Sequence, residues 1–414
     1  MDFDDTPEEA EFRAEVRAFL GAHAEPKGTA RPASRARPID AAELARARAW
    51  QAHKADAGLA AITWPMRWGG REAAPILQVI YNQEEAAYAV PRGVFEIGLG
   101  MCIPTMLAYA SPAQLERHVR PALRGEEIWC QLFSEPAAGS DVAGLRTRAE
   151  RDGGDWIING QKIWTSGAHL ANFGILVARS DPTVPKHAGL TFFFLDMRSP
   201  GVEVRPIRQI SGGSHFNEVF LTDVRIPDAQ RLGAVGAGWK VSLTTLMNER
   251  LAVGDVPRPD VEDLLALARL VQIDGAPALA DPVLRARIAE WHVRSQGLRF
   301  SRFRTMTALS RGQTPGPESA IAKVVNAAKL QDIAACGLDL LGAAGMVMES
   351  GIAPDIAPMH ALFQEALLFS PGLRIAGGTD EILRNIIAER VLGLPPDIRV
   401  DKDVPFNQLP QGAC

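Results

Sequence analysis

The sequence has little of what marks several large protein classes. Its 414 residues include four cysteines, none of them in a Cys-x-x-Cys spacing, so neither a disulfide framework nor a thiolate metal site is expected. Its eight histidines are dispersed and form no His-Glu-x-x-His motif, so no metal is predicted. No Gly-x-Gly-x-x-Gly follows an expected strand, and the nearest run, residues 233–238, has the wrong spacing. A Rossmann-type site is therefore not expected.

Charge excess and long apolar runs are also lacking. The formal net charge is −5 and is spread along the chain, which argues against nucleic acid or an anionic membrane as a partner. No uninterrupted apolar run has the length of a membrane span. The acidic start, residues 1–5, has the features of neither a signal peptide nor a transit peptide. These absences predict a cytoplasmic protein.

What is present suffices for two or three domains, since 47% of the residues are hydrophobic. Residues 1–125 favour helices, the first beginning at Thr6 as a cap with Pro7 after it. Residues 126–235 alternate short apolar runs with turn signals, the pattern of a compact antiparallel β domain. Helical periodicity returns over 236–396, and Pro395-Pro396 ends it, so 397–414 are expected to form a loose tail. The predicted fold is mainly α with an inserted β domain.

Two segments of the β region carry possible chemistry. Residues 131–141 run from an apolar strand into a loop rich in small and hydroxyl side chains, which suits a phosphate or the polar edge of a ring system. Residues 159–167 begin with a hairpin signal and place Trp164 two positions before Ser166, so a regular strand would point indole and hydroxyl to the same side. By themselves these patterns favour an ordinary turn and a core tryptophan.

Two helical segments are further candidates. On a helix over 238–251, a stripe of Ser242, Thr245, Glu249 and Ala252 surrounds one carboxylate with small or polar residues. This stripe is either the wall of a pocket that contains a base or a solvated face. The pattern alone favours the solvated face. Residues 377–381 (Gly-Gly-Thr-Asp-Glu) form a helix start, which is either simply capped by Thr379 or faces an anionic or carbonyl ligand.

Taken in order, these segments resemble the acyl-CoA dehydrogenase family. The motifs Ser-Glu-Pro-x-x-Gly-Ser-Asp, Asn-Gly-Gln-Lys-x-Trp-x-Ser and Gly-Gly-Thr-x-Glu-Ile-x-Arg-Asn-Ile-Ile-Ala-Glu-Arg-x-Leu-Gly-Leu-Pro are jointly specific, and the likeness covers almost the whole chain. It implies an N-terminal helical domain, a middle β domain and a C-terminal four-helix bundle, usually in a tetramer. It also implies FAD-dependent α,β-dehydrogenation of an acyl-CoA to a trans-2-enoyl-CoA, with electrons passing to an electron-transfer flavoprotein or a similar acceptor.

The resemblance also assigns site residues. It places residues 131–134 beside the flavin with Ser134 as a donor, Trp164 against the isoalloxazine, and Ser166 at N5, which receives the hydride. The full set of implied FAD contacts is Gln131, Leu132, Phe133, Ser134, Ser140, Trp164, Thr165, Ser166, Thr379 and Glu381. The implied substrate contacts are Ser140, which would touch pantetheine, Asn248, Arg250, Gly377 and Gly378.

The resemblance leaves two placements for the catalytic base. Many members carry a Glu directly before the Gly-Thr of the last motif, where this chain has Gly377. Members similar to isovaleryl-CoA dehydrogenase carry it earlier, in a Glu-Arg-Leu context that Glu249 matches. Glu249 is therefore the predicted base, and the Gly377 N–H is the predicted donor to the thioester carbonyl, because an enolate needs preorganised donors.

Two positions depart from the family pattern. The Arg-x-x-Phe-Gly stretch that reaches a neighbouring subunit's FAD is absent, and its region reads Val256-Pro-Arg-Pro-Asp260. Asp339 stands where a Gln precedes the bundle's Gly-Gly. The chain is thus either a complete enzyme in a homo-oligomer (a tetramer or a dimer) or a subunit of a hetero-oligomer, with a flavin oxidase or monooxygenase on the same scaffold as a further alternative. The sequence does not specify the length, branching or steroid or polyketide nature of the acyl group.

Overall fold

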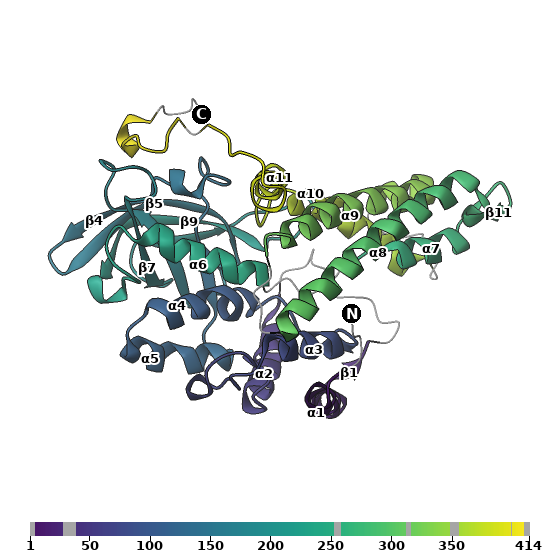
Figure 1. Ribbon diagram of the computed structural model, residues 1–414, viewed down its shortest axis with the longest axis horizontal. Coiled ribbons are helices and arrows are strands. Elements are labelled where there is room, and N and C mark those ends of the chain that lie inside the picture. Colours follow the sequence, from purple (N-terminus) through teal and green to yellow (C-terminus); the bar gives the residue numbers. More distant parts are fainter. Residues whose placement is uncertain are drawn as a thin grey trace.

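The computed structural model describes residues 5–27, 39–251, 258–311, 316–347, 356–398 and 400–409, apart from the side chains of 249–251 and 309–310. An N-terminal group of helices, a β domain and a long C-terminal bundle follow one another along the chain (Figure 1). This is the predicted fold class. Within the described residues no helix is both long and apolar enough to cross a bilayer.

The N-terminal helices begin where the capping signals predict. Thr6 caps the first helix and forms a capping box with Glu9, and Pro7 occupies the first turn. The helices are α1 (Pro7–His23), α2 (Ala41–Asp56), α3 (Pro75–Glu85), α4 (Ile103–Tyr109, entered through a π turn at Gly98–Cys102) and α5 (Pro112–Leu123). Helix α1 buries Phe12, Val16 and Leu20.

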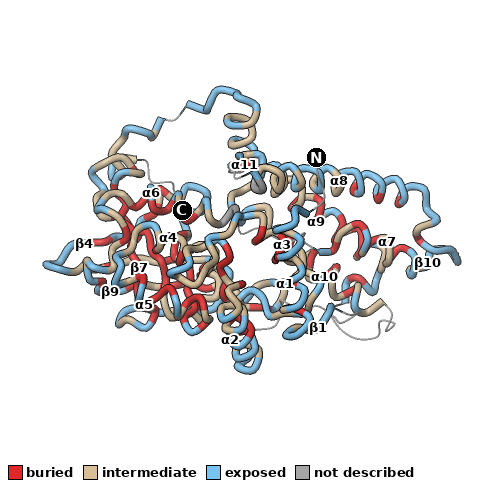
Figure 2. Tube along the Cα trace, turned by 60° about the horizontal axis from the view of Figure 1, so that its bottom comes forward, coloured by how far each residue is buried: buried red, intermediate tan, exposed pale blue. Residues whose placement is uncertain are grey.

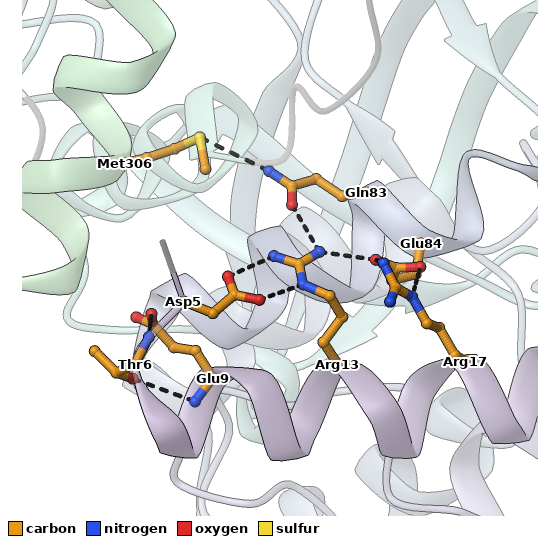
Figure 3. A network of polar contacts seen from close by, with 8 residues as sticks. All are labelled: Asp5, Thr6, Glu9, Arg13, Arg17, Gln83, Glu84 and Met306. Carbon is orange, nitrogen blue, oxygen red and sulfur yellow. Dashed lines mark hydrogen bonds and ion pairs between the residues drawn. The ribbon is translucent and has the colours of Figure 1, made fainter. Parts of the chain in front are cut away.

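Polar contacts fasten α1 to α3 and connect α3 to the bundle. Arg13 on α1 donates to Asp5, to Gln83 and to Glu84, and Arg17 donates to the same Glu84 (Figure 3). The Gln83 amide also lies 3.9 Å from the Met306 sulfur of α8 (Pro282–Ser310). The N-terminal helices therefore contact the long bundle helix as well as each other.

The β domain is a sheet with two cores. Its strands are β3 (Trp129–Leu132), β4 (Arg148–Asp152), β5 (Asp155–Ser166), β6 (Phe173–Arg179), β7 (Leu190–Asp196), β8 (Val202–Pro206) and β9 (Phe216–Pro227), ordered β3-β6-β4-β5-β9-β8 with β7 paired to β6. On β7, Phe192 and Phe194 join a core shared with α4, α5 and α6 (Gly238–Leu251), whereas Phe193 and Leu195 join the opposite core. This double burial explains why the strand is apolar throughout.

The sheet is mixed instead of wholly antiparallel. The pairs β4–β5, β5–β9, β6–β7 and β8–β9 are antiparallel, as the turn signals predict, but β3–β6 and β4–β6 are parallel. Both parallel pairs join strands that are not consecutive in the chain, since β4 and β5 lie between β3 and β6. Turn signals report only neighbouring strands, so they did not reveal these pairs.

The C-terminal helices share a core of their own. They are α6 (Gly238–Leu251), α7 (Val261–Leu270), α8 (Pro282–Ser310), α9 (Ser319–Leu341), α10 (Ala357–Leu373) and α11 (Asp380–Ile386), which continues as a π turn, Ile387–Val391; a small hairpin, β10 (Gln272–Ile273) and β11 (Ala276–Pro277), joins α7 to α8. Helices α7 to α10 pack around Leu264, Trp291, Ile333 and Phe363. Much of the described surface of α8 is exposed (Figure 2). Helix α6 lies instead across β7 and α4 (Figure 1).

The prediction of a loose C-terminal tail is wrong for residues 400–409. This segment crosses back to the β domain (Figure 1), where Pro405 pairs with Pro185 in a β-bridge and Phe406 covers the Arg179 guanidinium. Composition suggested a tail because the segment has no helical or strand periodicity. Its contacts are with residues more than two hundred positions away.

Candidate active site

The first candidate loop is held against β5 from its beginning. Ser134, half-buried, follows β3, and its carbonyl accepts a hydrogen bond of 2.9 Å from the Ile163 N–H. Gln131 is also half-buried, whereas Leu132 and Phe133 are buried. The structure thus brings the 131–134 segment next to the strand that carries Trp164 and Ser166. Ser140, farther along the loop, is exposed.

A buried ion pair fixes this junction. Lys162 Nζ lies 2.8 Å from Glu135 Oε1 and 3.1 Å from the Phe133 carbonyl oxygen, and the lysine side chain is completely buried. Glu135 also accepts the backbone N–H groups of Arg146 and Thr147. Burial opposes ionisation of Glu135, but Lys162 and these donors outweigh it and lower the carboxyl pKa. The sequence did not predict that Glu135 and Lys162 would form an ion pair, although each lies inside one of the recognised motifs.

Trp164 reaches its position through a β-bulge. The pairing of β5 with β9 shifts register between Lys162 and Thr165, and Trp164 has the left-handed φ of 59°. The bulge breaks the regular alternation of burial, because Lys162 and Thr165, three positions apart, are both buried. Trp164 is 55% exposed and Ser166 is half-buried, whereas Lys162 is fully buried. The indole makes an edge contact with Phe216, with ring centroids 6.0 Å apart.

The stripe on α6 faces protein at its start. Ser242 and Thr245 are fully buried, and Thr245 Oγ1 lies 2.8 Å from Thr105 Oγ1 on α4. The solvated-face alternative is therefore wrong for these two residues. Asn248 is half-buried. The side chains of Glu249 and Arg250, and all of Ala252, lie outside the described residues.

The glycine turn before α11 is built as predicted and is anchored by residues that sequence analysis did not select. Thr379 caps α11 by accepting the Ile382 N–H, and Gly377 and Gly378 adopt φ values of 62° and 91°. Lys323 Nζ donates to the Gly378 carbonyl oxygen at 2.6 Å. Asp380, 2% exposed, accepts from Arg374 at 2.7 Å, while the Glu381 side chain is exposed. In the sequence, the signal for these anchoring residues was the charge of Asp380 inside the cap motif, which needs a cationic partner when it is buried.

The candidate segments thus form three groups. The loop after β3 and strand β5 are hydrogen-bonded to each other. Helix α6 packs on β7 and α4, and α11 packs on α9. In Figures 1 and 2, α11 lies where the β domain meets the bundle.

The β5 surface fits a flat ligand with polar edges. Trp164 offers an exposed aromatic face, and the Thr165 hydroxyl is buried without a hydrogen-bond partner in the described structure. The Thr165 hydroxyl is enclosed by protein on the side of Lys162, so the exposed Trp164 ring is the part of this surface that can receive a ligand. These residues suit the isoalloxazine of FAD, with Ser134 and Ser166 half-buried beside it.

Comparison with known proteins decides the family. Family models match in chain order, with the acyl-CoA dehydrogenase N-terminal domain over residues 6–126, the middle domain over 130–224 and the C-terminal domain over 236–392. The chain belongs to the acyl-CoA dehydrogenase family. As a member, it is an FAD-dependent oxidoreductase that acts on acyl-CoA thioesters.

Relatives support this membership along the whole chain. IpdE1 of Mycobacterium tuberculosis, an acyl-CoA dehydrogenase, is 37% identical over 94% of this chain and 98% of its own length. FadE34 of the same organism is 41% identical over 82% of this chain, but the match spans only 45% of FadE34. Among solved structures, a "Tcur3481-Tcur3483 steroid ACAD" superposes with a TM-score of 0.77 at 26% identity, covering 96% of this chain and 100% of that one.

Proposed function

We propose that this acyl-CoA dehydrogenase removes hydrogen from the α and β carbons of an acyl-CoA to give the trans-2-enoyl-CoA, with Glu249 as the base that takes the α-proton. The observation that carries this proposal is the burial of Ser242 and Thr245, because Glu249 continues their stripe on α6. Gly377, at the other placement known in the family, has no side chain to serve as a base.

The neighbouring groups fit the charge changes of this reaction. Loss of the α-proton places negative charge on the thioester oxygen, and the Gly377 N–H is the proposed donor to it. The turn that presents this N–H is fixed by Lys323 and by the Arg374–Asp380 pair. Bound FAD supplies the acceptor for the β-hydride.

We further propose how the chain holds its ligands. The FAD contacts are Gln131, Leu132, Phe133, Ser134, Ser140, Trp164, Thr165, Ser166, Thr379 and Glu381, and the acyl-CoA contacts are Ser140, Asn248, Arg250, Gly377 and Gly378.

The proposed domain limits are 1–125, 126–235, 236–396 and 397–414. The electron acceptor is proposed to be an electron-transfer flavoprotein or a similar carrier.

The decisive experiment replaces the base. In Glu249→Gln, we expect FAD to stay bound while turnover falls by roughly 10²–10⁴-fold, the usual scale for a general base. The matched control is Glu262→Gln, which changes an exposed glutamate on α7 and should leave turnover unchanged. Both are measured by flavin bleaching with a panel of acyl-CoA thioesters, including a ring-bearing acyl group, since one structural neighbour is titled a steroid enzyme. Near-normal turnover in Glu249→Gln would assign the base to another carboxylate.

A hetero-oligomeric assembly is the second candidate. It is favoured by the departures at Val256–Asp260 and at Asp339, and a structural neighbour is titled the "ChsE4-ChsE5 complex from Mycobacterium tuberculosis". That neighbour is 24% identical and its likeness by itself concerns the fold. Purifying this chain without a partner distinguishes the homo-oligomer from the hetero-oligomer. A yellow, active homo-oligomer supports the complete enzyme, and a colourless chain that gains FAD with a partner supports the mixed assembly.

A further inference from the structure

The C-terminal segment is docked on the loop between β6 and β7. Pro405 pairs with Pro185, and the N–H groups of Phe406 and Asn407 donate to the carbonyl oxygens of Val184 and Pro182, each at 2.9 Å. Three successive residues of the tail thus make backbone contacts with one short stretch of the β domain. Such a set of contacts orders both segments together.

A first link runs from the tail to the loop that follows Ser140. The Phe406 ring covers Arg179, whose guanidinium carbon lies 3.4 Å from the ring centroid. Arg179 is 4% exposed and donates to the carbonyl oxygens of Ala143 and Leu145, at 2.6 and 3.1 Å, and to that of Lys186. Burial lowers the pKa of this guanidinium to about 10. The ring therefore completes the enclosure of a cation that holds the turn Val142–Gly144.

A second link is ionic and independent of the first. Lys186 Nζ lies 2.8 Å from Asp141 Oδ2 and 2.6 Å from Asp401 Oδ2. The lysine side chain is only 11% exposed, so this ammonium is shielded from water on most sides. Asp141 follows Ser140 directly, and Asp401 belongs to the tail. One cation therefore joins the tail to the same loop.

The other end of the loop has an anchor of its own. Glu135 accepts the N–H groups of Arg146 and Thr147 and pairs with Lys162, all within the β domain. The two links through Arg179 and Lys186 act instead on residues 141–145. Through Arg179 and Lys186, the tail is thus linked to the part of the loop next to Ser140 that Glu135 does not hold.

We propose that residues 400–409 are a positioning element for acyl-CoA binding, acting through Phe406–Arg179 and Asp401–Lys186 on the loop after Ser140. This inference rests on the proposed function, in which Ser140 contacts the pantetheine of the substrate. Phe406 and Asp401 are positioning residues, because they act through Arg179 and Lys186 and do not themselves touch the proposed ligands.

The first arm of the test needs no ligand. Hydrogen exchange is measured at the amides of Gly144 and Leu145, which donate to Asp141 and Val142 within the loop. It compares the full chain with a chain ending at Ile398, with Phe406→Leu and with Asp401→Asn. We expect exchange at these amides to rise by about 10-fold or more in the truncated chain and less in the single variants. Asp403→Asn, which removes the same charge from an acid without a described ion pair, should not change it.

The second arm uses the FAD-loaded full enzyme and the thioester of the panel that bleaches the wild-type flavin fastest. We expect KM to rise by about 10-fold in Phe406→Leu with kcat changed by less than about 2-fold and with FAD content unchanged. Unchanged exchange in the truncated chain overturns the inference, and so does raised exchange with an unchanged KM. Raised exchange in a protein whose wild type turns over no thioester would instead overturn the proposed function and leave the ordering role of the tail supported.

Discussion

Two charged clusters in this protein have similar distances but differ in how far water reaches them. Lys162 and Glu135 lie 2.8 Å apart inside the β domain, with 0% and 7% of their side chains exposed. Arg13 and Glu84 are also 2.8 Å apart, but they lie between α1 and α3 with 18% and 14% of their side chains exposed, next to Arg17, which is 62% exposed (Figure 3). Water can replace a lost partner in the second cluster and cannot in the first. Distance alone therefore says little about what either pair contributes to stability.

The largest effect is expected when the buried pair is broken. Lys162→Met should lower the free energy of unfolding by about 3–5 kcal/mol, because Glu135 would be left buried without the cation that compensates its desolvation. Urea unfolding followed by circular dichroism measures this change. The double variant Lys162→Met with Glu135→Gln should recover part of the loss, since no uncompensated charge is left. A loss below about 1 kcal/mol would place the pair in the class of surface ion pairs.

The pH dependence of the buried pair has a definite sign. Folding lowers the pKa of Glu135 from its ordinary value of 4.5, so its stabilising contribution is fully present above pH 4.5 and is lost as the pH falls through the lowered value. Glu135→Gln has no such ionisation. The difference in unfolding free energy between the wild type and this variant should therefore be constant from pH 7 to 5 and narrow below pH 4.5. A difference that widens on acidification would contradict this assignment.

Arg13 should show an intermediate effect. Its side chain is 18% exposed and donates to Asp5, Gln83 and Glu84, so Arg13→Met removes several charge-assisted hydrogen bonds but leaves partners that water can reach. We expect a loss of about 1–2 kcal/mol in unfolding free energy. A loss as large as that of Lys162→Met would show that this cluster is shielded from water in solution.

The smallest effect is expected at Arg17. Arg17→Ala should lower the free energy of unfolding by less than Arg13→Met does, and about 0.5 M salt should reduce that loss further, because exposed charges are screened. The cost of Lys162→Met should hardly change with salt. Urea unfolding at low and high salt provides both values. A salt-independent cost at Arg17 would remove the distinction between the two clusters.

The candidate site was only partly accessible to sequence reasoning. Thr379 as a cap and the apolar strands around Phe192 follow from local patterns, and the structure confirms both. The bulge at Trp164 did not follow, because a left-handed φ at a tryptophan has no local sequence signal. Lys162 and Glu135 are 27 positions apart, so neither strand pattern nor turn chemistry indicated that they would be paired. The role of Glu249 stays a proposal based on the family motif and on the buried stripe before it.

The sequence by itself determined the family, the helical–β–helical order and the positions where helices begin, because those depend on motifs and on neighbours a few residues apart. Only the tertiary structure decided that two strand pairs are parallel, that Lys162 is buried and paired, and that Phe406 returns to cover Arg179. The reason is physical: desolvation and charge pairing are set by groups that the folded chain brings together from distant positions, and local periodicity carries no record of them.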